Sequence, residues 1–223
     1  METPAMILGL LRPARIGVGW AALLGACAVA TACSSNTPAA PDAFIAATMG
    51  PGTDSPNSIC NLGSTQQWLD VGVATTGTNL PKTVKDGDSQ NGSPVSVNCS
   101  VTTAGGGFDI RLSIIEEGTN GGSLTITSPA GAGAVTDSGG SGISVQFQSA
   151  SNGAFNQTDC TLTYSYNGGT VPDNPPIAAG RIWGHVECPK AISSGTTVTA
   201  PDGGLVARQC DGKADFLFEQ CGQ

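Results

Sequence analysis

The sequence has few charged and few aromatic side chains. Charged residues occupy 12% of the 223 positions and aromatic residues 5%, whereas glycine occurs 32 times and proline 14 times. This composition excludes a coiled coil, a multi-pass membrane protein and a collagen-like rod. The sequence is therefore informative about location and architecture, and much less so about activity.

Positive charge is scarce as well. Nine lysine and arginine residues stand against seventeen aspartate and glutamate residues, and the isoelectric point is about 4.3. A chain with a net charge of −8 has no positive field to attract a phosphate backbone. We therefore expect no nucleic-acid partner.

The sequence contains one histidine, His185, and no Cys-x-x-Cys motif. A zinc site would need an unusual set of ligands, so we expect no metal and no other cofactor. The segment 136–140, Thr-Asp-Ser-Gly-Gly, is similar to the nucleophile segment of chymotrypsin-like proteases. However, Thr136 replaces the leading glycine, and His185 follows the serine although that fold places it before. We therefore expect that the protein is not an enzyme.

Residues 1–32 have the features of a secretory signal peptide. Arg12 and Arg15 precede an apolar run, residues 16–32, that contains no charged residue. The run is seventeen residues long and ends in small residues, whereas a membrane-spanning helix needs about 20 residues. We interpret the run as a cleaved signal and not as a transmembrane helix.

The run ends in Ala30-Thr31-Ala32-Cys33, which resembles the lipobox of bacterial lipoproteins. In that family the cysteine thiol carries a diacylglycerol and becomes the new N-terminus. Leu24-Gly25-Ala26-Cys27 matches the same pattern and is a rival. Cleavage before Cys33 leaves an even set of six cysteines, whereas cleavage before Cys27 leaves an unpaired thiol outside the cell. We predict lipidation at Cys33.

The lipobox resemblance implies a bacterial cell-envelope protein whose partner is the membrane that holds its lipid. Ser34 and Ser35 follow the cysteine. Lipoprotein families use an acidic residue there for retention in the inner membrane, so the resemblance favours the outer membrane or the cell surface.

Residues 33–58 are predicted to form a disordered tether. The segment contains four prolines and no sustained apolar period. Phe44 and Ile45 are its most apolar pair, and we interpret them as part of a solvated linker. Residues 59–223 have the size of one domain and contain no second linker.

Apolar and polar residues alternate within residues 59–223. This pattern predicts antiparallel strands with one face on a core. We predict an all-β domain, either a sandwich or a half-open barrel, with about 8–10 short strands. The clearest alternation is in residues 108–114, 143–148 and 159–166, and turn formers stand at Asn91-Gly92, Asn167-Gly168-Gly169 and Asp211-Gly212.

One strand, residues 181–188, departs from this pattern because Trp183 falls on its polar face. Arg181, His185 and Glu187 share that face. An exposed tryptophan there would mark a possible binding surface. The alternative is that Trp183 lies under a loop or a neighbouring strand, with the stems of Arg181 and Glu187 packed round it.

The six cysteines that follow Cys33 are predicted to form three disulfides, because export places them in an oxidising compartment. Fifteen pairings are possible. Cys210 and Cys221 flank one predicted turn and strand, so we predict this local pair first. The pairs Cys99–Cys188 and Cys60–Cys160 then remain.

Three segments also resemble the mycobacterial lipoprotein-antigen family: Val84-Lys85-Asp86-Gly87, Val95-Ser96-Val97-Asn98-Cys99 and Val186-Glu187-Cys188. The resemblance implies a small β domain with one disulfide, which maps onto Cys99 and Cys188. It also implies a surface antigen or adhesin without enzyme activity.

We therefore expect a disulfide-stapled, lipid-anchored envelope protein that acts by binding or as a surface component. A protein or a glycan is the expected partner, and the polar faces with Gln146, Gln148 and Asn156 offer hydrogen bonds to sugars. One alternative is a carrier of a lipid or another apolar ligand in a half-barrel. A second alternative is a hydrolase that uses His185.

Overall fold

The structure is a computed structural model that describes residues 38–76, 79–172 and 175–223. The predicted signal peptide and both candidate lipidation sites, Cys27 and Cys33, lie outside the described residues. The domain begins at Pro38.

One short helix and fifteen strands make up the described part of the chain. They are β1 (Asp42–Gly50), α1 (Asn57–Cys60), β2 (Gln66–Val71), β3 (Val84–Lys85), β4 (Ser89–Gln90), β5 (Ser93–Ala104), β6 (Gly107–Glu116), β7 (Gly122–Thr127), β8 (Val135–Thr136), β9 (Gly139–Ser149), β10 (Gly153–Thr163), β11 (Ser165–Tyr166), β12 (Gly169–Thr170), β13 (Ile177–Ala178), β14 (Arg181–Thr199) and β15 (Leu205–Glu219).

Thirteen of these strands form one antiparallel sheet. Its main path runs β2-β1-β15-β14-β10-β9-β7-β6-β5-β4, while β11 and β12 form a separate hairpin. Strand β8 pairs with both β6 and β9, so β6, β7, β9 and β8 make a closed ring of four strands within a sheet that is otherwise open. The predicted all-β, antiparallel, disulfide-stapled fold is confirmed.

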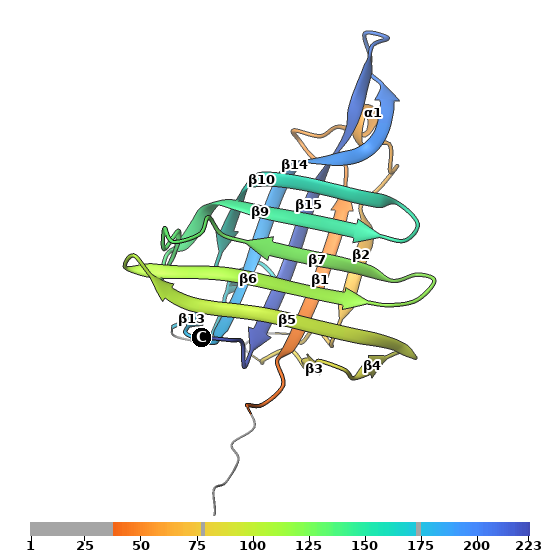
Figure 1. Ribbon diagram of the computed structural model, residues 1–223. Coiled ribbons are helices and arrows are strands. Elements are labelled where there is room, and N and C mark those ends of the chain that lie inside the picture. The colour runs from red at the N-terminus through yellow and green to blue at the C-terminus, as the bar shows by residue number, and fades with distance from the viewer. Residues whose placement is uncertain (1–37, 77–78, 173–174) are drawn as a thin grey trace, which may run out of the picture. The chain divides into compact units, whose positions relative to one another are not determined.

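The sheet folds back on itself into two layers that enclose the core (Figure 1). Strands β5, β6, β7, β9 and β10 form a front layer, and β14, β15, β1 and β2 cross behind it. Large side chains from both layers are fully buried in a single cluster. They include Phe147 and Phe155 from the front layer and Met49, Phe216 and Phe218 from the back layer.

Gly212 of β15 faces the core at a point where Phe147 of the front layer packs against the strand. A Cβ atom at this position would stand 2.8 Å from Cε2 of Phe147 and 3.2 Å from the terminal carbon of Met49. The prediction of a turn at Asp211-Gly212 is wrong, because β15 continues through it. The turns at Asn91 and Asn167 are confirmed, with φ values of 52° and 51° in the left-handed region.

The predicted tether over residues 33–58 is wrong for Asp42–Gly50, which form β1 in the middle of the back layer. Strand β1 pairs with β15 along its whole length and with β2 on its other edge. Its alternate residues enter two different cores: Ile45 and Met49 face the main core, and Phe44 faces a smaller outer core. A strand covered on both faces shows no alternation of apolar and polar residues, so the sequence pattern that predicts half-buried strands does not reveal β1.

All six cysteines of the domain are paired, as predicted, but each predicted pairing is wrong. The disulfides are Cys60–Cys210, Cys99–Cys221 and Cys160–Cys188. Cys210 and Cys221 do not pair because the chain from Cys210 to Glu219 runs on in β15, which carries it roughly 30 Å away from Cys210. The pairs Cys99–Cys188 and Cys60–Cys160 are excluded because each of these cysteines has another partner.

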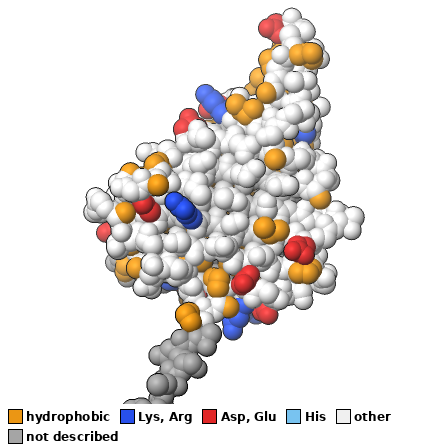
Figure 2. Space-filling model, in the orientation of Figure 1, with side chains coloured by type: hydrophobic (Ala, Val, Ile, Leu, Met, Phe, Trp, Pro, Cys, Tyr) orange, Lys and Arg blue, Asp and Glu red, His pale blue; other side chains and the backbone are white. Residues whose placement is uncertain are grey.

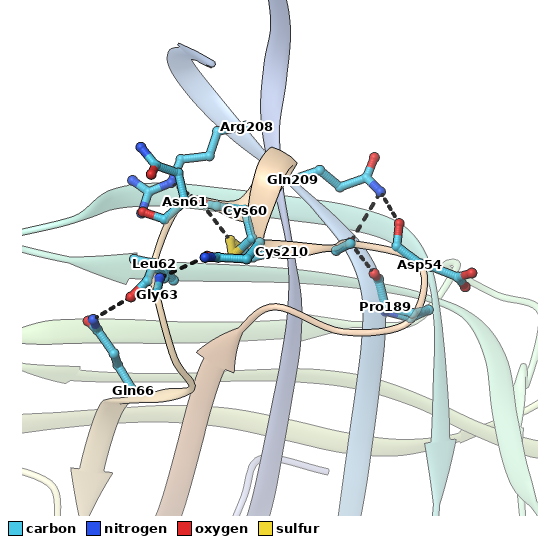
Figure 3. The surroundings of a disulfide bond; sticks show 12 residues. Asp54, Cys60, Asn61, Leu62, Gly63, Gln66, Pro189, Arg208, Gln209 and Cys210 are labelled. Carbon is cyan, nitrogen blue, oxygen red and sulfur yellow. Dashed lines mark hydrogen bonds between the residues drawn. A yellow bond between two sulfur atoms is a disulfide. The ribbon is translucent and has the colours of Figure 1, made fainter. Parts of the chain in front are cut away.

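The Cys60–Cys210 disulfide joins the α1 segment to β15 at one end of the two layers (Figure 3). Arg208 donates from Nε to the carbonyl of Cys60 at 2.6 Å, and Gln209 donates from its amide to the carbonyl of Asp54 at 3.0 Å. Buried Ser55 donates to the carbonyl of Pro189 at 2.6 Å. These bonds close that end of the core.

Candidate functional site

Trp183 does not contribute to an exposed surface. Its side chain is fully buried in the outer core, with Phe44 and Leu217 from the neighbouring strands and Tyr166 and Val171 above it. The prediction of an exposed tryptophan is therefore wrong, and the alternative, burial beneath a loop, is confirmed.

The β11–β12 hairpin covers this outer core, and Tyr166 bonds the hairpin to the segment that follows β2. Its hydroxyl donates to the carbonyl of Thr75 at 3.0 Å and accepts from the Thr75 N–H at 2.8 Å. The amide of Asn167 donates to the same carbonyl at 2.9 Å. The β11–β12 hairpin and the segment after β2 are thus linked to each other, and together they shield Trp183 from solvent.

His185 lies next to this cover, in a row of charged residues on β14 and β15. The pairing register places His185 opposite Asp215 and Glu187 opposite Lys213. Nδ1 of His185 is 2.8 Å from Oδ1 of Asp215, and Nε2 is 3.5 Å from Oε1 of Glu187. Lys213 Nζ is 3.2 Å from Glu187 and 3.6 Å from Asp211.

This row is half-buried, and it shifts the pKa values of its members. Burial lowers the pKa of His185, but the hydrogen bond and charge of Asp215, together with Glu187, outweigh burial and hold the pKa above the usual 6.5. Burial raises the pKa of Glu187, but Lys213 and His185 outweigh it and lower that pKa. The row therefore favours a protonated His185 between two carboxylates.

The chemistry of the row follows from the two contacts of the imidazole. Both ring nitrogens face a carboxylate, so the nitrogen that would accept a proton from a nucleophile is directed at Glu187.

Arg181, on the same strand, donates to Glu219 at 2.8 Å. No three histidine, cysteine or acidic side chains of the described residues are grouped so as to hold a metal ion.

We expect stability to fall as the pH rises through the pKa of His185. Because that pKa is raised in the folded chain, the stabilisation is fully present below the unfolded value of about 6.5 and is lost as the pH rises from there through the higher pKa of the folded state. Urea unfolding at pH 6 and pH 8.5 should show a smaller difference between the two pH values for His185→Gln than for the wild type. An unchanged difference in the variant would contradict this assignment.

The front layer presents a second and larger candidate surface, which we call the polar face. It consists of the central outward residues of β5, β6, β7, β9 and β10; Arg111 is the one charged residue among them, and the outward carboxylates of Asp109 on β6 and Asp159 on β10 adjoin it. Figure 2 views this side of the molecule, where charged side chains are few over these strands. Its members are Ser96, Asn98, Ser100, Arg111, Ser113, Ile115, Ser123, Thr125, Thr127, Ser144, Gln146, Gln148, Ala154 and Asn156.

The strand register arranges one row of this face across six strands. We call it the amide row, and it extends from β5 to β14, where Ile192 ends it. Gln146 and Asn156 were proposed from alternation as sugar-binding residues, and they are register partners. The other members come from strands whose pairing the sequence does not reveal. The row is Asn98, Ser113, Thr125, Gln146, Asn156 and Ile192.

The amide row leads into an open hollow of about 410 Å³ between β10, β14 and β15. Asn156, Ile192 and Gln209 line it, together with Asp159 and Lys190, which carry opposite charges. Ile192 is one of the few large apolar side chains on the surface, with 47% of it exposed. Sequence reasoning missed Ile192 and Gln209, because only the folded register places them beside Asn156.

A further open hollow, of about 750 Å³, lies at the edge of the back layer and is lined by Asp70, Gln67 and Lys82. Burial raises the pKa of Asp70, and a hydrogen bond from Gln67 opposes that shift. Gln90 is held beside Asp70 by accepting from the N–H of Gly72 at 2.6 Å and donating to the Asp70 carbonyl at 2.9 Å.

The architecture defines a disulfide-linked, two-layer, all-β domain with a filled core and open hollows on its surface. Comparisons with models of protein families, with curated proteins and with solved structures find no match to this chain. The described residues contain no helix that is long and apolar enough to span a membrane.

Proposed function

We propose that the protein is a lipid-anchored component of the bacterial cell envelope that binds a partner on its outer surface and does not catalyse a reaction. The observation that carries this proposal is the pairing of all six cysteines of the domain across segments 150, 122 and 28 residues apart. Such disulfides form and persist outside the reducing cytoplasm. They accord with a signal peptide and a lipidated Cys33.

The arrangement of the strands suits a protein that is displayed from its N-terminal end. Asp42, close to the start of the domain, pairs with Glu219 at one end of β15. The hairpin formed by β14 and β15 projects from the opposite end (Figure 1). Leu205, the first residue of β15, lies roughly 45 Å from Glu219, the last residue of the strand. An anchor at Cys33 would hold this hairpin away from the membrane.

The two alternatives receive less support from the geometry. A carrier needs room for an apolar ligand, whereas large side chains such as Phe147 and Phe216 fill the space between the layers. A hydrolase needs His185 to face a nucleophile, whereas its second nitrogen faces Glu187. Recognition on the outer surface is the function that the described residues support best.

Lipidation is tested by expressing the full chain in a bacterium that processes lipoproteins, with an alkyne analogue of palmitate in the medium. We expect the wild type to be labelled and Cys33→Ser to lose the label completely, because the thioether can form only on the lipobox cysteine. The matched control is Cys27→Ser, which should keep the label. Loss of label in Cys27→Ser alone would move the anchor to Cys27, and an unlabelled wild type would refute the anchor.

A further inference from the structure

We propose that the amide row and the hollow at its end bind an uncharged polysaccharide, which lies across the strands of the front layer. This inference deepens the proposed function, on which it rests, by naming the chemical class of the partner. Three features of the surface carry it: free amide groups, a scarcity of positive charge, and an apolar side chain beside the last amide.

Three of the four side-chain amides of the polar face are free to bind a ligand. Within the part of the chain that the structure describes, the side-chain amides of Asn98, Gln146 and Gln148 make no hydrogen bond. By contrast, the amides of Gln90 and Gln157 serve the fold: Gln90 bonds to Gly72 and Asp70, and Gln157 accepts from the N–H of Lys190 at 2.7 Å. An amide presents two donors and one acceptor oxygen, which match sugar hydroxyls.

The register places one polar side chain of the row on each of five neighbouring strands, from Asn98 on β5 to Asn156 on β10. Neighbouring strands lie about 4.8 Å apart, so the row from Asn98 to Ile192 extends roughly 24 Å. Ser113 and Thr125 occupy the positions between the amides, and their hydroxyls are 3.5 Å apart. A long polymer with polar groups along its length can therefore make contacts on several strands at once.

The charge of the face selects among polymers. Arg111 is its one cation and lies outside the amide row, and the carboxylates of Asp109 and Asp159 adjoin the face. Nucleic acids and acidic polysaccharides require several cations to balance their own charge. A protein partner would be expected to find aromatic anchors at the centre of the interface, and the polar face has no aromatic residue. A neutral polysaccharide needs neither cations nor such anchors.

The hollow at the end of the row supplies the apolar contact that a sugar ring can use. Ile192 is 47% exposed and is the register partner of Asn156. Asn156 is oriented by donating from its amide to the hydroxyl of Ser194 at 2.8 Å, which leaves its carbonyl oxygen as an acceptor. An apolar surface beside a fixed polar group is the usual composition of a small-molecule site.

Isothermal titration calorimetry with the full chain, purified in detergent, tests this proposal. The probes are the uncharged hexasaccharides of β-1,4-linked N-acetylglucosamine and of β-1,4-linked glucose, and the matching disaccharides. We expect at least one hexasaccharide to bind, and to bind at least tenfold more tightly than its disaccharide, because only the longer chain spans several strands. An acidic hexasaccharide should bind more weakly.

Variants locate the site. Gln146→Ala combined with Asn156→Ala removes two amides from the row and is expected to weaken hexasaccharide binding roughly tenfold or more. The matched control, Asn152→Ala combined with Gln223→Ala, removes one half-buried and one exposed amide outside the row, as the test pair does within it, and should leave the affinity unchanged. Thermal unfolding of each variant checks that the domain is folded.

Three outcomes would overturn the proposal: no binding of either neutral hexasaccharide, equal loss in both double variants, or a preference for the acidic sugar. Each can occur while Cys33 is still labelled with palmitate. The failure of the sugar site is therefore distinguishable from the failure of the anchored-protein proposal.

Discussion

Replacing Cys60 and Cys210 together by alanine is expected to lower the free energy of unfolding by about 5 kcal/mol, as the chain-entropy model gives for a closed loop of this length. The two cysteines are 150 residues apart, so their bond restricts nearly the whole unfolded domain. Both are buried, and the bond holds the α1 segment against β15. For a domain of this size, such a loss corresponds to a fall in Tm of roughly 10–20 °C.

The disulfide with the shortest sequence separation provides the comparison. Removing Cys160 and Cys188, which are 28 residues apart, is expected to cost about 3.5 kcal/mol, because the smaller loop has less entropy to lose. Urea unfolding of the two double variants, monitored by tryptophan fluorescence, measures both losses. If the short-range pair costs more than the long-range pair, local packing and not loop closure determines the effect.

The sequence predicts those strands well that have one face in water. Residues 108–114 alternate strictly, and they lie in β6 with Ile110, Leu112 and Ile114 buried. It fails for β1, where Ala43 and Ala47 face the main core and Phe44 faces the outer core. Alternation reports solvent on one face, so a strand buried on both faces gives no such pattern.

Partners across strands are the part of the structure that local patterns do not contain. Parity predicts that six cysteines pair, but the choice of partner depends on which strands meet after the sheet folds. The same limit applies to the candidate sites. His185 was identified as a site residue, yet Asp215 lies on β15 and becomes its neighbour only through the β14–β15 register. Gln146 and Asn156 were identified by alternation, but Ile192 was not.

Trp183→Ala is expected to destabilise the domain by about 3–5 kcal/mol, the range for truncating a large aromatic side chain in a core. The indole is fully buried between β14 and the β11–β12 hairpin, and its ring lies 5.3 Å from that of Tyr166. The substitution would leave a cavity under the cover.

Trp183→Phe separates packing from polarity. The indole Nε1 is buried without a hydrogen-bond partner, so phenylalanine keeps much of the apolar contact and removes an unsatisfied donor. We expect this variant to lose less than half of the stability that Trp183→Ala loses. Ile192→Ala, on the exposed face, is the control and should change stability by no more than about 0.5 kcal/mol. A loss below about 1 kcal/mol for Trp183→Ala would show that the tryptophan does not support the cover, because truncating a packed aromatic side chain costs several times more.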